Sequence, residues 1–127
     1  MKILITGDRE WSDVLKMMEI LTQFPAGTTI IHGACRGADN MAHALGEELE
    51  FVIRSYPASW HEFGKRAGSL RNQAMLDQEH LEHEPFDLCL AFHNEISRSR
   101  GTRDMMSRCK KANIETRLIQ SDAIKTK

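Results

Sequence analysis

The chain has 127 residues, of which 41% are hydrophobic and 28% are charged, and its formal net charge is −1. This length fits one globular domain that buries an adequate core without disulfides or a structural metal. No apolar run approaches the roughly 18 residues of a membrane span, and the apolar start at residues 1–7 is too short for a signal peptide. We therefore expect a cytoplasmic protein without a membrane partner, in which residues 1–120 form one domain and residues 121–127 a flexible tail.

The three cysteines, Cys35, Cys89 and Cys109, show no spacing typical of a metal site. Their odd number argues against a disulfide framework, which agrees with a cytoplasmic compartment. The net charge of −1 creates no general attraction for nucleic acid. We therefore expect no metal and no cofactor, and the sequence leaves open whether the chain forms a homo-oligomer.

Short apolar segments alternate with segments of helical periodicity along the whole chain. We predict strands over residues 2–6, 28–32, 51–56, 86–92 and 115–119. We predict helices after a cap at Ser12, after the turn at 37–39, over 69–81 and over 102–112. The alternation predicts an α/β fold, namely a single Rossmann-like three-layer domain with a mainly parallel sheet of about five strands.

The strand-to-helix loops of such a sheet carry the candidate site. Right-handed crossovers place these loops at one edge, and ligands bind at that edge near the switch in strand order. The loops concentrate glycines, arginines, tryptophans and acids, and we expect the following to contact a ligand: Gly7, Asp8, Arg9, Trp11, Gly33, Arg36, Gly37, Asp39, Trp60, Gly101 and Thr102.

Two glycine turns are typical of phosphate binding. Gly33 and Gly37 let the backbone approach a ligand closely, and the amides that open the next helix then face a phosphate. Arg36 adds a charged fork, and Gly101 with Thr102 repeats the arrangement at a later helix. One such turn is more often only a turn, but two turns with arginines on one edge favour a binding site.

The sequence leaves alternatives open for one aspartate and for two tryptophans. Asp39 either accepts hydrogen bonds from ribose hydroxyls or caps its helix. Trp11 or Trp60 supplies a surface on which a base stacks. The partner that these residues predict is a nucleotide-like small molecule.

Five short motifs follow one another in the order of a known family. They lie at residues 7–9 (GDR), 32–39 (HGACRGAD), 57–60 (PASW), 67–72 (AGSLRN) and 99–104 (SRGTRD). Together they resemble the YspA-like branch of the SLOG superfamily, which includes the DNA-processing protein A Rossmann domain and the Lonely-Guy phosphoribohydrolases. The resemblance runs from residue 3 to about residue 119. It implies a Rossmann-like fold, binding of nucleotides or ADP-ribose derivatives, and a pocket position for Arg71 and Asn72.

One departure bears on catalysis. The resemblance to Lonely-Guy enzymes implies a glutamate three residues after the threonine of the Gly-Thr pair, where this chain has Met105. Asp104 comes one residue earlier, about 100° away around the helix, so we expect it to reach the pocket only if that turn is rotated or the loop is reshaped. Asp39 and Asp104 are the candidate catalytic residues, and the catalytic residues remain unassigned.

Three functions compete at this point. We favour binding of a nucleotide or nucleotide-derived (ADP-ribose-like) ligand, as a sensor or sequestering module. The alternative is an N-glycosidic hydrolase acting on nucleoside monophosphates, which needs a carboxylate beside the anomeric carbon. The second alternative, single-stranded DNA binding, needs an extended basic groove and aromatic platforms, which a net charge of −1 does not favour.

Overall fold

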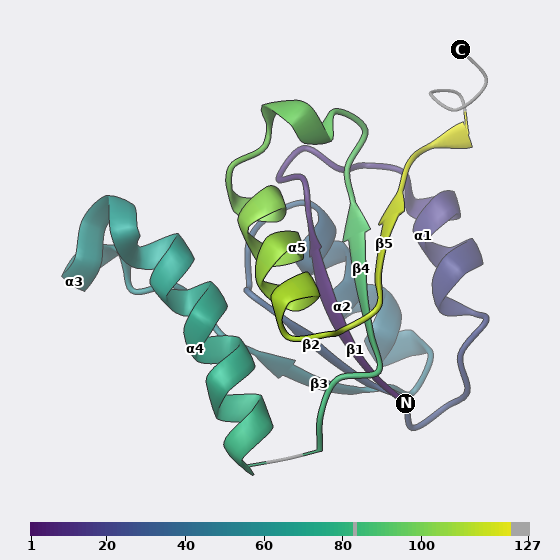
Figure 1. The fold of residues 1–127 in the computed structure, drawn as a ribbon. Coiled ribbons are helices and arrows are strands. Elements are labelled where there is room, and N and C mark those ends of the chain that lie inside the picture. Colours follow the sequence, from purple (N-terminus) through teal and green to yellow (C-terminus); the bar gives the residue numbers. More distant parts are fainter. Residues whose placement is uncertain (83, 123–127) are drawn as a thin grey trace.

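The computed structural model describes residues 1–82 and 84–122 (Figure 1). Five strands form one sheet: β1 (Lys2–Gly7), β2 (Thr29–His32), β3 (Val52–Ser55), β4 (Leu88–Phe92) and β5 (Thr116–Ile119). The strand order is β3-β2-β1-β4-β5, and every pairing is parallel. The predicted α/β fold with a mainly parallel five-stranded sheet is thereby confirmed.

Helices cover both faces of this sheet and make the three layers that the sequence predicts. They are α1 (Val14–Leu21), α2 (Ala38–Glu48), α3 (Trp60–Phe63), α4 (Ala67–Glu82) and α5 (Gly101–Lys111), with 3-10 turns η1 (Gly64–Arg66) and η2 (Ile96–Arg98). Figure 1 shows α4 and α5 in front of the sheet and α1 and α2 behind it.

The alternation of side chains along β1 explains the two cores. Ile3 and Ile5 pack into the cluster under α1 and α2, whereas Leu4 packs into the cluster under α4 and α5. Successive residues of a strand point to opposite faces, so a strand between two helical layers is apolar on both sides. All five residues of β4 are buried for the same reason.

Two local features differ from the sequence prediction. The cap of α1 is Asp13 rather than Ser12, because the Asp13 carboxylate accepts a hydrogen bond from the Lys16 amide at 2.9 Å. The segment before α4 forms α3 and η1, which the prediction missed because four helical residues show no periodicity. In Figure 1 this segment projects away from the sheet.

A buried ionic cluster fastens α4 to the sheet. Glu79 is fully buried, and its carboxylate accepts two hydrogen bonds from Arg54 at 2.8 and 3.0 Å and one from Tyr56 at 2.5 Å. Lys2 Nζ lies 2.9 Å from the same carboxylate. These contacts set the position of α4, which forms one wall of the site described below.

Two expectations concern the ends of the chain and the membrane. Of the expected flexible tail, residues 123–127 lie outside the described residues, whereas Asp122 forms an ion pair with Lys16 at 2.9 Å. In the described part of the chain, the helices lack the combination of length and hydropathy that crossing a bilayer requires.

Candidate functional site

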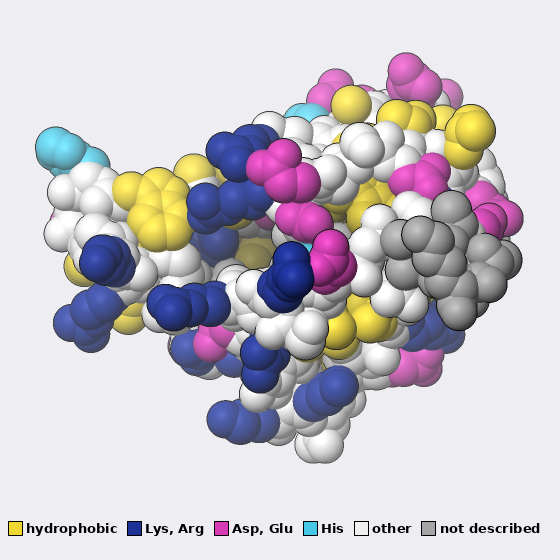
Figure 2. All heavy atoms as spheres, turned by 90° about the horizontal axis from the view of Figure 1, so that it is seen from above, with side chains coloured by type: hydrophobic (Ala, Val, Ile, Leu, Met, Phe, Trp, Pro, Cys, Tyr) yellow, Lys and Arg dark blue, Asp and Glu magenta, His cyan; other side chains and the backbone are white. Residues whose placement is uncertain are grey.

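A pocket of about 670 Å³ opens at the carboxyl edge of the sheet. It lies where β1 and β4 end side by side, with Gly7 paired to Phe92, and this is the point at which the strand order switches. Its walls come from the loops after β1, β2 and β4 and from the facing sides of α4 and α5. Seen onto this edge, Figure 2 shows the molecule hollowed between lysine and arginine side chains.

The fold brings most of the predicted site residues together. Those that line the pocket are Gly7, Asp8, Arg9, Gly33, Arg36, Asp39, Trp60, Arg71, Asn72, Gly101 and Thr102. Trp11 and Gly37 are outside the lining, and each has a structural role instead.

Trp11 belongs to the hydrophobic core. Its side chain is 5% exposed, its ring packs edge-on against Phe92 at a centroid distance of 5.4 Å, and its indole N–H donates to the Asp13 carbonyl. The prediction that Trp11 stacks on a base is therefore corrected. Trp60, on α3, is 47% exposed and lines the pocket, with the Arg9 guanidinium 5.5 Å from its ring centroid.

Gly37 allows two loops to pack without space for a side chain. Its φ is +78°, and a Cβ atom there would lie 2.4 Å from the carbonyl oxygens of Asp8 and Arg9. The next amide, from Ala38, donates to the Asp8 carbonyl at 3.1 Å. The loop after β1 thus covers the start of α2, and Gly37 faces protein backbone rather than the pocket.

The amides of the β2–α2 loop are directed toward the protein. Gly33 and Cys35 donate to Asp39 Oδ2 at 3.0 and 3.3 Å, and Ala34 donates to His32 Nδ1 at 2.9 Å. Asp39 therefore holds the β2–α2 loop and does not cap α2, whose N-cap is Gly37 without a side-chain cap hydrogen bond. These three amides thus have partners inside the fold, and of the amides that open α2, those of Ala38 and Asn40 donate to the carbonyls of Asp8 and Cys35.

Two buried side chains, Asp39 and His32, accept hydrogen bonds from this loop, and their protonation states at neutral pH follow from their surroundings. Burial raises the pKa of Asp39 to about 6, although hydrogen bonds from Cys35 and Gly33 and the charge of Arg71 oppose the rise. Burial, followed by the charge of His43, lowers the pKa of His32 to about 4. At pH 7 Asp39 is therefore mainly ionised and His32 neutral, so both remain hydrogen-bond acceptors for the loop.

Arg71 connects α4 to the same loop. Its Nη1 donates to the Gly33 carbonyl at 2.5 Å, and its Nε donates to Asn72 Oδ1 at 2.9 Å. A side chain on Gly33 would meet this guanidinium, because a Cβ atom would lie 2.5 Å from Nη1. The guanidinium thus lines the pocket and also connects two of its walls, α4 and the β2–α2 loop.

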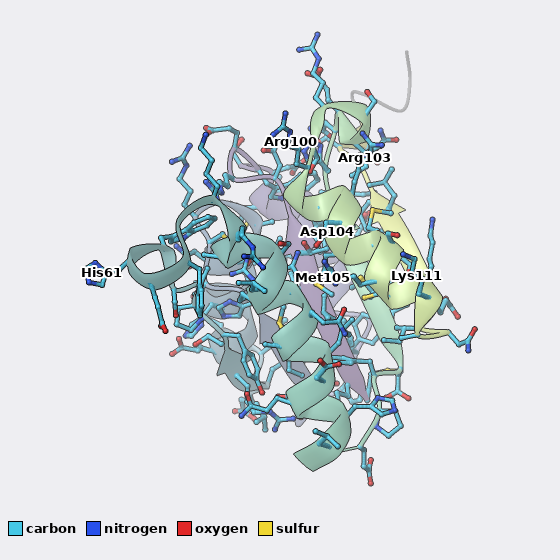
Figure 3. The ribbon with its side chains drawn as sticks, turned by 60° about the vertical axis from the view of Figure 1, so that its left-hand side comes forward. His61, Arg100, Arg103, Asp104, Met105 and Lys111 are labelled. Atoms are coloured by element: carbon cyan, nitrogen blue, oxygen red, sulfur yellow. The ribbon has the colours of Figure 1, made fainter. Side chains whose placement is uncertain are left out.

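Asp104 faces the pocket, and its neighbour Met105 does not. Asn72 Nδ2 donates to Asp104 Oδ2 at 3.0 Å and Arg108 Nε donates to the same oxygen at 2.8 Å, whereas Met105 is buried in the core (Figure 3). Asp104 lines the pocket because the pocket extends between α4 and α5. Burial alone would raise the pKa of Asp104, but the bonds from Arg108 and Asn72 lower it.

Other lining residues were not assigned to the site from the sequence. They include Lys65 on η1, His93 directly after β4, and Arg98, Ser99 and Arg100 before α5. His93 Nδ1 accepts from the Glu95 amide at 2.9 Å, so Nε2 carries the proton and lies 3.9 Å from Asp8 Oδ2. Its position directly after a predicted strand was the signal that could have identified it.

Comparison with known proteins agrees with this architecture. The model of the YspA, cpYpsA-related SLOG family matches residues 1–63, and Gene 61 protein of Mycobacterium phage D29 is 36% identical over 122 residues. That alignment covers 89% of this chain and 91% of the phage protein. The chain belongs to the YspA, cpYpsA-related SLOG family. No solved structure gives a significant match.

Apart from Arg71, whose guanidinium donates to the Gly33 carbonyl and to Asn72, the cations around the pocket of this SLOG domain fall into two groups. Arg36 pairs with Glu10 at 2.6 Å, and Arg98 pairs with Glu95 at 3.2 Å. The other group consists of Arg9, Lys65 and Arg100, which form no ion pair with a described carboxylate. The second group comes from three different segments and leaves positive charge available at the pocket.

Gly101, the first residue of α5, is open on its pocket side. A Cβ atom there would have no described atom within 4 Å, and its φ is not in the positive range. Neither the backbone conformation nor the described packing of the SLOG domain requires a glycine at this position. The residue keeps the N-terminal end of α5 accessible to a group that enters the pocket.

Proposed function

We propose that this SLOG domain binds a phosphate-bearing nucleotide in the pocket at its carboxyl edge and acts as a sensor or sequestering module. The observation that carries the proposal is the group of pocket cations Arg9, Lys65 and Arg100, which form no ion pair with any carboxylate in the part of the chain that the structure describes. Cations that lack a partner in the protein attract an anionic ligand, and arginine forks match phosphate oxygens. The helix dipole of α5 adds to this attraction at Gly101.

The other parts of the pocket suit a nucleoside. Trp60 offers a partly exposed indole on which a base can stack. Asp8 supplies a carboxylate acceptor and Thr102 a hydroxyl for ribose hydroxyls. We do not extend the proposal to single-stranded DNA, because the carboxylates that line the pocket would repel a continuous phosphate chain.

A pair of arginine variants tests this assignment. We expect Arg100→Gln to weaken AMP binding about tenfold, since a charge-assisted hydrogen bond contributes about 1.5–3 kcal/mol. Arg103→Gln is the matched control: it lies on the same turn, is exposed and is outside the pocket lining (Figure 3). Isothermal titration calorimetry would measure both, with adenosine as the ligand that lacks the phosphate. Adenosine binding as tightly as AMP, or equal losses in both variants, would contradict the proposal.

The second candidate function is hydrolysis of the N-glycosidic bond of nucleoside monophosphates. Asp104 favours it, because its carboxylate lines the pocket and its pKa is lowered, so that it is ionised at neutral pH. We favour binding without turnover because Oδ2 of this carboxylate is already engaged by Asn72 and Arg108. In addition, the position of the Lonely-Guy glutamate is occupied by Met105, which is buried.

We expect at most a trace of free base when the protein is incubated with AMP, GMP or CMP. Chromatographic measurement of adenine, guanine and cytosine would check this, with Asp104→Asn as the comparison variant. Robust release by the natural protein that is lost in Asp104→Asn would establish the hydrolase instead.

A further inference from the structure

A second hollow, of about 760 Å³, lies between α5 and the edge strand β5. Its lining comes from η2, α5, the turn after α5 and β5, and none of these residues lines the pocket at the carboxyl edge. The residues that line it are Ile96, Arg103, Met106, Ser107, Lys110, Lys111, Thr116 and Leu118. We call this surface the α5–β5 groove, and it is separate from the site of the proposed function.

Part of the α5–β5 groove is apolar and does not belong to the core. Ile96, Met106 and Leu118 come from three different elements, and each is half-buried. Among the described residues, neither core cluster contains any of the three. Leu118 precedes Ile119, which packs into the core under α1 and α2, so Leu118 points to the opposite face, toward α5. The groove therefore has an apolar surface that the described packing leaves partly uncovered.

The helical wall of the α5–β5 groove is positively charged. Arg103, Lys110 and Lys111 are exposed and form no ion pair with a described carboxylate. Figure 3 shows Arg103 and Lys111 on the side of α5 that faces away from α4. The described lining contains no acidic residue. The groove therefore attracts negatively charged groups.

The strand wall of the α5–β5 groove has an unpaired edge. β5 is the last strand of the sheet and pairs with β4 on one side (Figure 1). The Glu115 carbonyl accepts a hydrogen bond from the Cys89 amide at 2.8 Å, on the β4 side. Alternate residues of a strand direct their backbone groups to opposite sides, so the N–H and C=O groups of Thr116 and Leu118 point to the open edge. Such groups are a template for another strand.

We propose that the α5–β5 groove binds an acidic segment of another protein, which adds to β5 as an extended strand. Backbone groups of the segment pair with Thr116 and Leu118, and its apolar side chains cover Ile96 and Met106. Its carboxylates lie beside the cations of α5. An unpaired strand beside a helix, with an apolar surface between them, has the features of a site for strand addition.

Other occupants match the groove less well. Residues 123–127 follow β5 in the sequence but contain two lysines and no acid. The other edge strand, β3, contains Arg54 and no acid, so pairing it with β5 of a second copy would bring this arginine toward the cations of α5. Nucleic acid would contact these cations but would leave the unpaired backbone of β5 without partners.

Fluorescence anisotropy with a labelled peptide, Glu-Val-Glu-Val-Glu-Val-Glu, tests the charge of the partner. We expect this peptide to bind and the corresponding Lys-Val peptide not to bind. Lys110→Glu should weaken binding about fivefold or more, because it replaces an attraction by a repulsion. Arg66→Glu is the matched control: it changes the net charge equally, and Arg66 is exposed on η1 outside the groove. We expect it to change binding less than about twofold.

Two N-methylated forms of the same peptide test strand addition without a change in the protein. Successive N–H groups of a strand point to opposite sides, so either the valine amides or the glutamate amides face β5. Methylation of the set that faces β5 should weaken binding about tenfold or more, whereas methylation of the other set should change it less than about twofold. Equal effects of the two forms would overturn the proposal.

The remaining outcomes are equally decisive. Absence of binding by the acidic peptide, or equal losses in Lys110→Glu and Arg66→Glu, would overturn the proposal. So would an oligothymidylate that binds more tightly than the peptide and is lost in Lys110→Glu, which would assign the groove to nucleic acid. Dimers in sedimentation velocity that Lys110→Glu abolishes would assign the groove to a second copy instead. If Lys110→Glu lowers the melting temperature, the two N-methylated peptides still decide the question with the natural protein.

Discussion

Glu79→Ala is expected to lower the free energy of unfolding by about 3–5 kcal/mol, the usual cost of removing one partner from a buried ion pair. The carboxylate is fully buried and is bound by Lys2, Arg54 and Tyr56. Its removal leaves Lys2, which is also buried, without this partner. Urea denaturation followed by circular dichroism would measure the change.

The same cluster predicts how stability depends on pH. Burial alone would raise the pKa of Glu79, but the hydrogen bonds from Arg54, Tyr56 and Lys2 lower that pKa from 4.5, the ordinary value for a glutamate, to about 2. Because the folded pKa is below the unfolded one, the contribution is complete above about pH 4.5 and is lost as the pH falls toward 2. The natural protein should therefore lose stability over this range more steeply than Glu79→Ala.

Asp77→Ala is the control for this experiment, because Asp77 is an exposed carboxylate on the same helix, α4. It should change the free energy of unfolding by about 0.5 kcal/mol or less. Equal stabilities of the Glu79→Ala and Asp77→Ala variants, or identical acid transitions of the natural protein and Glu79→Ala, would show that the cluster does not fasten α4.

Gly37→Ala is expected to destabilise the protein by about 2–6 kcal/mol, from two separate causes. A φ of +78° with a ψ of −123° strains a residue with a side chain by about 1–3 kcal/mol. The added Cβ would also lie 2.4 Å from the carbonyl oxygens of Asp8 and Arg9, and overpacking of this kind costs about 1–3 kcal/mol. Since Asp8 and Arg9 line the pocket, nucleotide affinity should fall as well.

Two other glycines separate these causes. Gly27 has a φ of +86° but open space around its Cβ position, so Gly27→Ala should show only the conformational cost, about 1–2 kcal/mol. Gly101 has neither the strained φ nor a described neighbour, so Gly101→Ala should remain within about 0.5 kcal/mol of the natural protein. If Gly37→Ala costs no more than Gly27→Ala, the loop after β1 does not pack against α2 as described.

The glycine comparison also connects stability with function. Gly37→Ala acts on folding and on the pocket together, whereas Gly101→Ala adds a methyl group only to the accessible end of α5. A variant that weakens AMP binding without a change in melting temperature would therefore come from Gly101 rather than Gly37.

The sequence by itself determined the order of strands and helices along the chain and the edge of the sheet at which the pocket opens. Strands such as residues 86–92 are continuously apolar, and this pattern depends only on neighbouring residues and on burial of both faces of the sheet. Right-handed crossovers then place the loops after the strands on one edge. For this reason Gly7, Gly33 and Gly101 could be assigned to the pocket from their positions in the chain.

Only the tertiary structure decided which side chains remain available to a ligand. Arg71 and the carbonyl of Gly33 are 38 residues apart in sequence, and their hydrogen bond depends on how α4 packs beside β2. Trp11 and Trp60 both follow predicted strands, but only Trp11 meets Phe92 in the core. Asp104 reaches the pocket because α4 and α5 pack side by side, a contact that no local pattern encodes. Local periodicity determines which segments form strands or helices and on which edge of the sheet their loops lie. Hydrogen-bond partners depend instead on the distances between elements, which only tertiary packing sets.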